Sequence, residues 1–129
     1  MRHIRTLGLV FIALGMIEIM WVLFCIFGGV LLGGVAAFGP DEPALWLGTG
    51  AYWLLALFNA PIAMLHLFAG ARLRRGRGLY VAIAAIAACL PALIFALYCS
   101  PFELAAAVYG LVVLLLPESR EILDPIDDF

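Results

Sequence analysis

The sequence contains few charged residues and no lysine. Of its 129 residues, 12% are charged and 67% are hydrophobic, and all seven basic residues are arginine. A soluble domain is about half apolar and about a quarter charged. The mean hydropathy of +1.17 agrees with this excess of apolar side chains. A chain with so few polar side chains cannot cover a surface that faces water, so we expect an integral membrane protein.

Familiar catalytic and ligand-binding motifs are also missing from the sequence. It has no Ser/His/Asp set and no Gly-rich phosphate loop. Cys25, Cys89 and Cys99 show neither CxxC nor Cys/His metal spacing, so we interpret them as small apolar side chains. A disulfide between Cys25 and Cys99 is a less favoured alternative. The sequence therefore predicts a non-enzymatic protein without a metal ion or a cofactor. The one short basic stretch, Arg72–Arg77, lacks the aromatic surface of a nucleic-acid site.

Four long apolar segments dominate the chain. They cover residues 7–38, 44–71, 79–99 and 101–116, and a membrane span needs about 20 residues. Backbone groups in lipid must pair within a helix, and short linkers make neighbouring helices antiparallel. We predict an all-α, four-helix antiparallel bundle forming one transmembrane domain over residues 1–129, with a short acidic tail at 117–129. The first segment is too long for one straight span, and tilting, a break at Gly28–Gly29 or projection beyond the bilayer remain alternatives.

The distribution of arginine predicts the orientation of these spans. Arg2 and Arg5 precede the first span, and Arg120 follows the fourth. The other four, Arg72, Arg74, Arg75 and Arg77, lie between the second and third spans. All seven therefore fall on one side, which the positive-inside rule makes cytoplasmic. We expect both termini in the cytoplasm, and contact with anionic lipid as a second role for the four-arginine linker.

Glu18 is the first candidate functional residue, because it is the only charged side chain inside the first segment. Counting about 1.5 Å per residue places it near the bilayer centre, level with Asn59 and Pro91. A carboxyl group at that depth is costly and normally faces protein or a water-filled cavity. We favour a protonated Glu18 that bonds to Asn59 or to a carbonyl freed by a helix proline. The alternative is a proton-binding site or polar gate.

Two further polar residues are interpreted as structural. His66 lies about 8 Å inside the cytoplasmic edge at the same rise, so we interpret it as an interfacial side chain. A role as a proton relay for Glu18 is less favoured, because the two residues differ in depth by more than one helical turn. Ser100 and Glu103 have the spacing of a capping box with proline at the first helical position, so Glu103 is assigned to a helix cap.

Small residues recur at four-residue spacing in three of the segments. Examples are Gly29 with Gly33, Ala84 with Ala88, and Ala106 with Gly110. This spacing allows helices to approach closely in lipid, where packing drives association. It suits a tightly packed monomer, a homo-oligomer or a complex with a membrane-protein partner.

The second half resembles a loose group of small, uncharacterised four-helix bacterial inner-membrane proteins. The resemblance rests on Ala69–Arg77, on the Ala-rich third segment with Pro91, and on Tyr109–Glu118. It implies a multi-pass protein of the bacterial inner membrane and no particular activity. We therefore expect a structural or accessory subunit that acts through helix packing. The alternatives are a small channel or proton-coupled transporter that uses Glu18, and a protein that binds anionic lipid.

Overall fold

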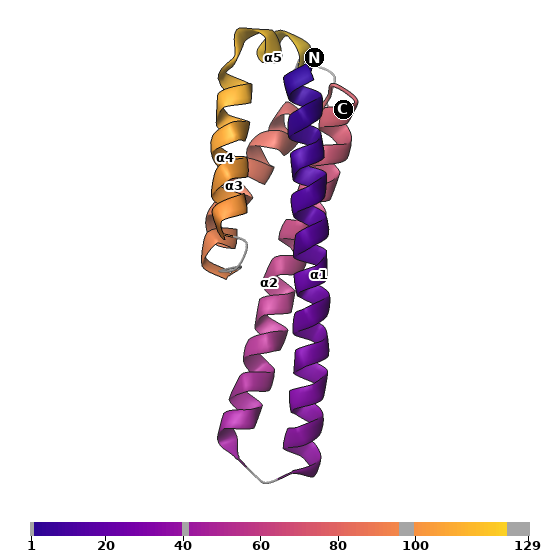
Figure 1. The fold of residues 1–129 in the computed structure, drawn as a ribbon, viewed down its shortest axis with the longest axis vertical. Helices are drawn as coiled ribbons and strands as arrows, with labels where there is room; N and C mark the ends of the chain where they lie inside the picture. Colours follow the sequence, from indigo (N-terminus) through magenta and orange to yellow (C-terminus); the bar gives the residue numbers. More distant parts are fainter. Residues whose placement is uncertain (1, 40–41, 96–99, 124–129) are drawn as a thin grey trace.

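The computed structural model describes residues 2–39, 42–95 and 100–123, and every regular element in these ranges is a helix (Figure 1). The helices are α1 (Arg2–Phe38), α2 (Pro43–Arg74), α3 (Leu79–Phe95), α4 (Ser100–Leu115) and α5 (Pro117–Ile122). The predicted all-α class is confirmed. Helices α1 and α2 are long and apolar enough to cross a membrane, whereas α3 and α4 are apolar but shorter. Cys99 and residues 124–129 of the predicted tail lie outside the described residues.

Helices α1 and α2 form a long hairpin that glycines hold close together. A Cβ atom on Gly70 would lie 2.6 Å from the carbonyl oxygen of Gly8, and one on Gly8 would lie 2.8 Å from that of Gly70. Further along, Gly28 faces Tyr52, so the two helices run in opposite directions. The two backbones meet at Gly8 and Gly70, whereas Gly29 and Gly33, the pair that the four-residue spacing marked in this segment, face the side chains of Trp53 and Thr49. Only glycine fits at positions 8 and 70, because two backbones occupy the space that a Cβ would need.

Helix α1 is continuous through Gly28 and Gly29, so of the three alternatives for the long first segment the break is absent. Its 37 residues make it about 55 Å long, and the 32 residues of α2 give about 48 Å, at 1.5 Å per residue. Pro61 also lies inside continuous helix. The α1–α2 hairpin is therefore much longer than the hydrocarbon core of a bilayer, which is about 30 Å thick.

Helices α3 and α4 form a shorter hairpin beside the end of α1 and α2 that carries the N-terminus (Figure 1). Phe102, near the start of α4, lines the same hollow as Ile17 of α1. The core at this end joins apolar side chains of all four helices, among them Leu7, Phe11, Leu73, Ile86 and Val113. The α1–α2 hairpin extends past α3 and α4 (Figure 1). We define its far part as residues 20–38 of α1 and 43–58 of α2 and name it the distal arm.

A glycine-containing turn and the short helix α5 lie at the N-terminal end of the molecule. Gly76 and Gly78 have φ angles of 73° and 98°, which the turn from α2 to α3 requires and which glycine adopts readily. Pro117 starts α5 after Leu116 adopts an extended backbone, because proline lacks the N–H that would continue α4. Helix α5 then crosses this end of the bundle (Figure 1), where Leu123 is buried in the core.

Candidate functional site

Each of the four long helices contributes one fully buried polar side chain to a single cluster. These side chains are Glu18 from α1, His66 from α2, Cys89 from α3 and Glu103 from α4, and each is 0% exposed. We name this set the polar cluster. Burying charged and polar groups is costly unless they pair with one another or with a bound ion. A cluster that draws one member from each of α1, α2, α3 and α4 is therefore the strongest candidate for a functional site in this fold.

The His66 ring is held at the centre of the polar cluster. Its Nδ1 lies 2.8 Å from Oε2 of Glu18, and its Nε2 lies 3.0 Å from the carbonyl oxygen of Ala85. The ring also stacks on Phe11, with centroids 5.5 Å apart and planes 2° from parallel. Both ring nitrogens face oxygen atoms. Two protonation states satisfy these contacts: an imidazolium that donates to both oxygens, or a neutral ring that accepts from a protonated Glu18 and donates to Ala85.

Cys89 and Glu103 complete the polar cluster on the other side of the ring. The Sγ atom of Cys89 lies 3.6 Å from His66 Nε2 and 3.4 Å from the carbonyl oxygen of Ala85. Glu103 interacts electrostatically with Glu18, His66 and Cys89. No group among the described residues forms a well-aligned hydrogen bond to either Glu103 oxygen or to Oε1 of Glu18, and Glu103 lies within side-chain hydrogen-bonding reach of Glu18 and Cys89. The cluster therefore has unused oxygen lone pairs that are shielded from solvent.

The predicted partner of Glu18 is wrong. Asn59 is buried, but its Nδ2 donates to the carbonyl oxygen of Leu55 in its own helix, at 2.8 Å. Glu18 instead bonds to His66. Pro91 lies inside α3 and is exposed, so it does not line the polar cluster. Counting residues along the helices placed Glu18 and Asn59 at the same depth, but their side chains form hydrogen bonds with other groups and not with each other.

The structural interpretations of His66 and Glu103 are also corrected. His66 is buried in the bundle rather than exposed at an interface, because its ring bridges α1 and α3. Glu103 lies in the first turn of α4, but its carboxyl group makes no capping hydrogen bond among the described residues. The side chain of Ser100 lies outside the described residues. The capping-box pattern thus correctly predicts the start of a helix. Its assignment of Glu103 to the helix cap is wrong, because this side chain is buried in the polar cluster.

Cys89 is the cluster member that the sequence did not single out. It was interpreted as a small apolar side chain, and it is indeed a buried free thiol, as is Cys25. Only Cys89 lies beside other polar groups. One feature of the sequence could have indicated Cys89. Each of the four apolar segments contains very few residues that can ionise or bind a metal, so each such residue is a candidate for a shared site. Sequence spacing gave no warning, because the four members come from four different helices.

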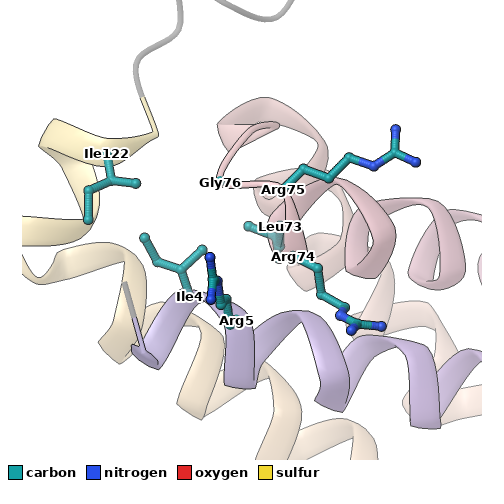
Figure 2. Close-up of a pocket in the computed structure, with 7 residues that line it drawn as sticks. All are labelled: Ile4, Arg5, Leu73, Arg74, Arg75, Gly76 and Ile122. Atoms are coloured by element: carbon teal, nitrogen blue, oxygen red, sulfur yellow. The ribbon is translucent and has the colours of Figure 1, made fainter.

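The predicted lipid- and topology-related arginines gather at the N-terminal end of the molecule. Arg74 and Arg75 are exposed, and the Arg72 guanidinium lies 5.2 Å from the Phe68 ring centroid. Figure 2 shows the side chains of Arg74 and Arg75 pointing away from a small hollow that Ile4, Leu73 and Ile122 line. Arg77 is exposed in the turn that follows α2. These arginines therefore present charge outward rather than forming an enclosed anion pocket.

Comparison with protein-family models, with curated proteins and with solved structures found no match to this chain. The resemblance of the second half to small four-helix inner-membrane proteins therefore stays a prediction. The functional argument consequently rests on the fold and on the chemistry of its side chains.

Proposed function

We propose that this protein is a non-enzymatic, multi-pass subunit of the bacterial inner membrane that acts by packing its distal arm against helices of another copy or of a membrane-protein partner. In this proposal α1 to α4 all cross the bilayer as an antiparallel bundle, with both termini in the cytoplasm. The 16 to 17 residues of α3 and α4 cover about 25 Å, close to the hydrocarbon thickness.

The observation that carries this proposal is the length of the distal arm. Helix α1 exceeds the hydrocarbon core by about 25 Å, and tilting within the usual range of up to 40° does not remove the excess. The arm nevertheless carries large apolar side chains that are more than half exposed on both helices: Met20, Leu23, Phe24, Phe27, Val30, Leu31, Val35, Trp46, Leu47, Leu54 and Leu57. Lipid alone cannot cover all of them, so contact with further protein is the favourable arrangement.

Two glycines in the distal arm provide independent support. A Cβ atom on Gly34 or on Gly50 would meet nothing within 4 Å. Neither glycine is required by the packing of the chain on itself, although each costs about 1 kcal/mol of helix stability relative to alanine. Glycines on a helix surface let a second helix approach closely, because no side chain separates the two backbones. Their position on the exposed arm therefore fits an intermolecular contact.

The test is to weigh the intact assembly by native mass spectrometry after extraction from its own membrane in a mild detergent. We expect a discrete oligomer or a fixed partner. Gly34→Leu and Gly50→Leu should shift the assembly towards the monomer, because each adds a bulky side chain where the proposed partner approaches. A Cβ atom at either position meets nothing within 4 Å, so we expect both variants to keep the monomer fold, which their helical circular-dichroism signal checks.

Ala51→Leu is the matched control, since Ala51 is exposed, adjoins Gly50 and points to a different side of α2. Its assembly should match that of the unmodified protein. A lone monomer in the unmodified protein would contradict the proposal. Equal assembly in all four proteins would show that the glycine face is not the contact.

Proton-coupled transport through Glu18 is a second candidate. The specific observation that favours it is the 2.8 Å contact between Glu18 and His66, which links two groups able to exchange a proton at the centre of the bundle. This candidate requires measurable flux, whereas the subunit proposal does not.

A further inference from the structure

The geometry of the polar cluster matches part of a tetrahedral metal site. Zinc bonds of about 2.1 Å to nitrogen and about 2.3 Å to sulfur, at tetrahedral angles, separate the two ligand atoms by about 3.6 Å. The separation of His66 Nε2 from Cys89 Sγ is 3.6 Å. One ligand atom each from His66, Cys89 and Glu103 lies within 4.8 Å of the others. A small inward movement of the Glu103 carboxyl group would complete a three-ligand arrangement.

The orientation of the His66 ring supplies the second feature of such sites. Histidines that bind a metal through one nitrogen usually donate the N–H of the other to a carboxylate, which fixes the ring and its tautomer. Glu18 Oε2 lies 2.8 Å from Nδ1, on the opposite side of the ring from Cys89. Phe11 stacks on the ring face and restricts its rotation. The ring is therefore already aimed with Nε2 towards Cys89 and Ala85.

The carboxyl group of Glu103 provides an independent indication of a ligand. It is 0% exposed, it faces the Glu18 carboxyl group and the Cys89 thiol, and no group among the described residues forms a well-aligned hydrogen bond to either of its oxygens. Two buried carboxyl groups beside a thiol satisfy one another only while protons lie between them. A divalent cation would satisfy the Glu103 carboxylate. One carboxylate from Glu103 and one thiolate from Cys89 together balance the charge of +2 on the ion, and Glu18 accepts from His66 Nδ1–H as a further carboxylate. The protons of the Cys89 thiol and of His66 Nε2, with that of Glu103 where it carries one, are released to bulk water as the metal binds.

We propose that His66 Nε2, Cys89 Sγ and the Glu103 carboxylate bind one divalent transition-metal ion of the zinc class, with Glu18 as the residue that positions the His66 ring. Mixed thiolate, imidazole and carboxylate ligands favour Zn²⁺ over hard cations such as Mg²⁺. On binding, His66 Nε2 loses the proton that it donates to the Ala85 carbonyl and bonds to the metal, while Nδ1–H donates to Glu18. The ion joins α2, α3 and α4, and so fastens the short hairpin to the long one. This inference is independent of the distal arm.

The experiment loads the metal during synthesis, because all three ligands are inaccessible to solvent in the folded protein. The full chain is produced in cells supplied with Zn²⁺ or, separately, with Co²⁺, and is purified in mild detergent. We expect about one metal ion per chain by elemental analysis. The Co²⁺ form should also show the absorption of a thiolate-to-cobalt charge transfer, which requires a cysteine ligand.

Cys89→Ala should abolish the charge-transfer band, and Glu103→Gln should lower metal content severalfold. Glu18→Gln should weaken metal binding about 10–100-fold, as loss of a ring-orienting partner does in other sites. Cys25→Ala is the matched control, since Cys25 is an equally buried free thiol outside the polar cluster. It should retain full metal content and the band.

Metal-free unmodified protein from both supplemented cultures would overturn the proposal, whatever the variants do. Retention of the metal in Cys89→Ala, or loss of it in Cys25→Ala, would also overturn it. Folding of each variant is checked by the helical circular-dichroism signal. If Cys89→Ala does not fold, Glu103→Gln and the cobalt spectrum of the unmodified protein still decide the question.

Discussion

Glu18 and His66 meet at 2.8 Å although they lie 48 positions apart and leave their helices at different depths. In the α1–α2 hairpin Gly15 faces Ala63 and Leu67, so Glu18 leaves α1 beyond the level of His66. Helical side chains lean towards the N-terminus of their own helix. Because α1 and α2 run in opposite directions, Glu18 and His66 lean towards each other. The two side chains therefore meet, although counting residues along α1 and α2 places their Cα atoms more than one helical turn apart along the hairpin axis.

Removing the carboxyl group of Glu18 should destabilise the protein strongly. Glu18→Ala leaves His66 Nδ1 buried without its partner, and breaking a buried pair typically costs about 3–5 kcal/mol. Unfolding by denaturing detergent, followed by circular dichroism, measures the loss. Asn59→Ala is the control, because its amide bonds only to a carbonyl of its own helix, and it should cost about 1 kcal/mol. Equal losses in the two variants would contradict the assigned pairing.

The contact of Gly8 with Gly70 should make Gly70 intolerant of any side chain. Gly70→Ala places a Cβ atom 2.6 Å from a backbone oxygen, so the helices must separate, at a cost of about 1–3 kcal/mol. Gly48→Ala meets only a side-chain atom at 3.7 Å and should stabilise by up to about 1 kcal/mol through helix propensity. Detergent unfolding of the monomer distinguishes the two. A stabilising Gly70→Ala would show that the close approach is absent.

The transport alternative makes a separate prediction. Protein reconstituted into liposomes should carry protons or ions above the level of empty liposomes, and Glu18→Gln should reduce that flux at least tenfold. The reason is that an amide cannot pass a proton to His66 as a carboxyl group can. A pH-sensitive dye inside the liposomes reports the flux. Asn59→Ala, which leaves the polar cluster intact, should conduct normally. Flux equal to that of empty liposomes would exclude this alternative.

The outward-facing arginines predict binding to anionic lipid. Neutralising Arg74 and Arg75 together should weaken association with anionic vesicles about 30-fold, at roughly 1 kcal/mol for each arginine near a charged surface. Co-sedimentation of protein in small nanodiscs with vesicles that contain anionic lipid measures the effect. Vesicles of neutral lipid serve as the control and should bind both forms equally weakly. Unchanged binding to anionic vesicles would leave the arginines with a topological role alone.

The predicted topology is tested by reporter fusions. Reporters that are active only in the cytoplasm should be active at either terminus and in the turn at Gly76, and silent between α1 and α2. The reason is that all seven arginines are predicted to lie on one side of the membrane. The reciprocal reporter, active only outside the cytoplasm, should give the opposite pattern. Activity at one terminus only would mean an odd number of spans.

Prediction from the sequence worked best where one helix alone decides the outcome. The apolar runs predicted the helical class, and the predicted segments 44–71 and 79–99 placed the start of α2 and the turn from α2 to α3 to within a few residues. Helix α5 lies in the segment that was predicted as a short acidic tail. Prediction from the sequence failed where the contact of a residue depends on how two helices pack against each other. The partner of Glu18 depended on the register and lean of α1 against α2. The role of Glu103 depended on which face of α4 turns inward, and a capping pattern carries no information about that.

The sequence by itself determined the helical class, the apolar exterior and the gathering of basic residues in a few short segments, because hydrophobicity and helix propensity act within a single segment. Only the tertiary structure decided that α1 and α2 extend beyond α3 and α4, that Gly8 and Gly70 touch, and that Glu18, His66, Cys89 and Glu103 share one buried site. The physical reason is that these relations depend on how the helices are rotated and shifted against one another. That arrangement follows from the packing of all four helices together.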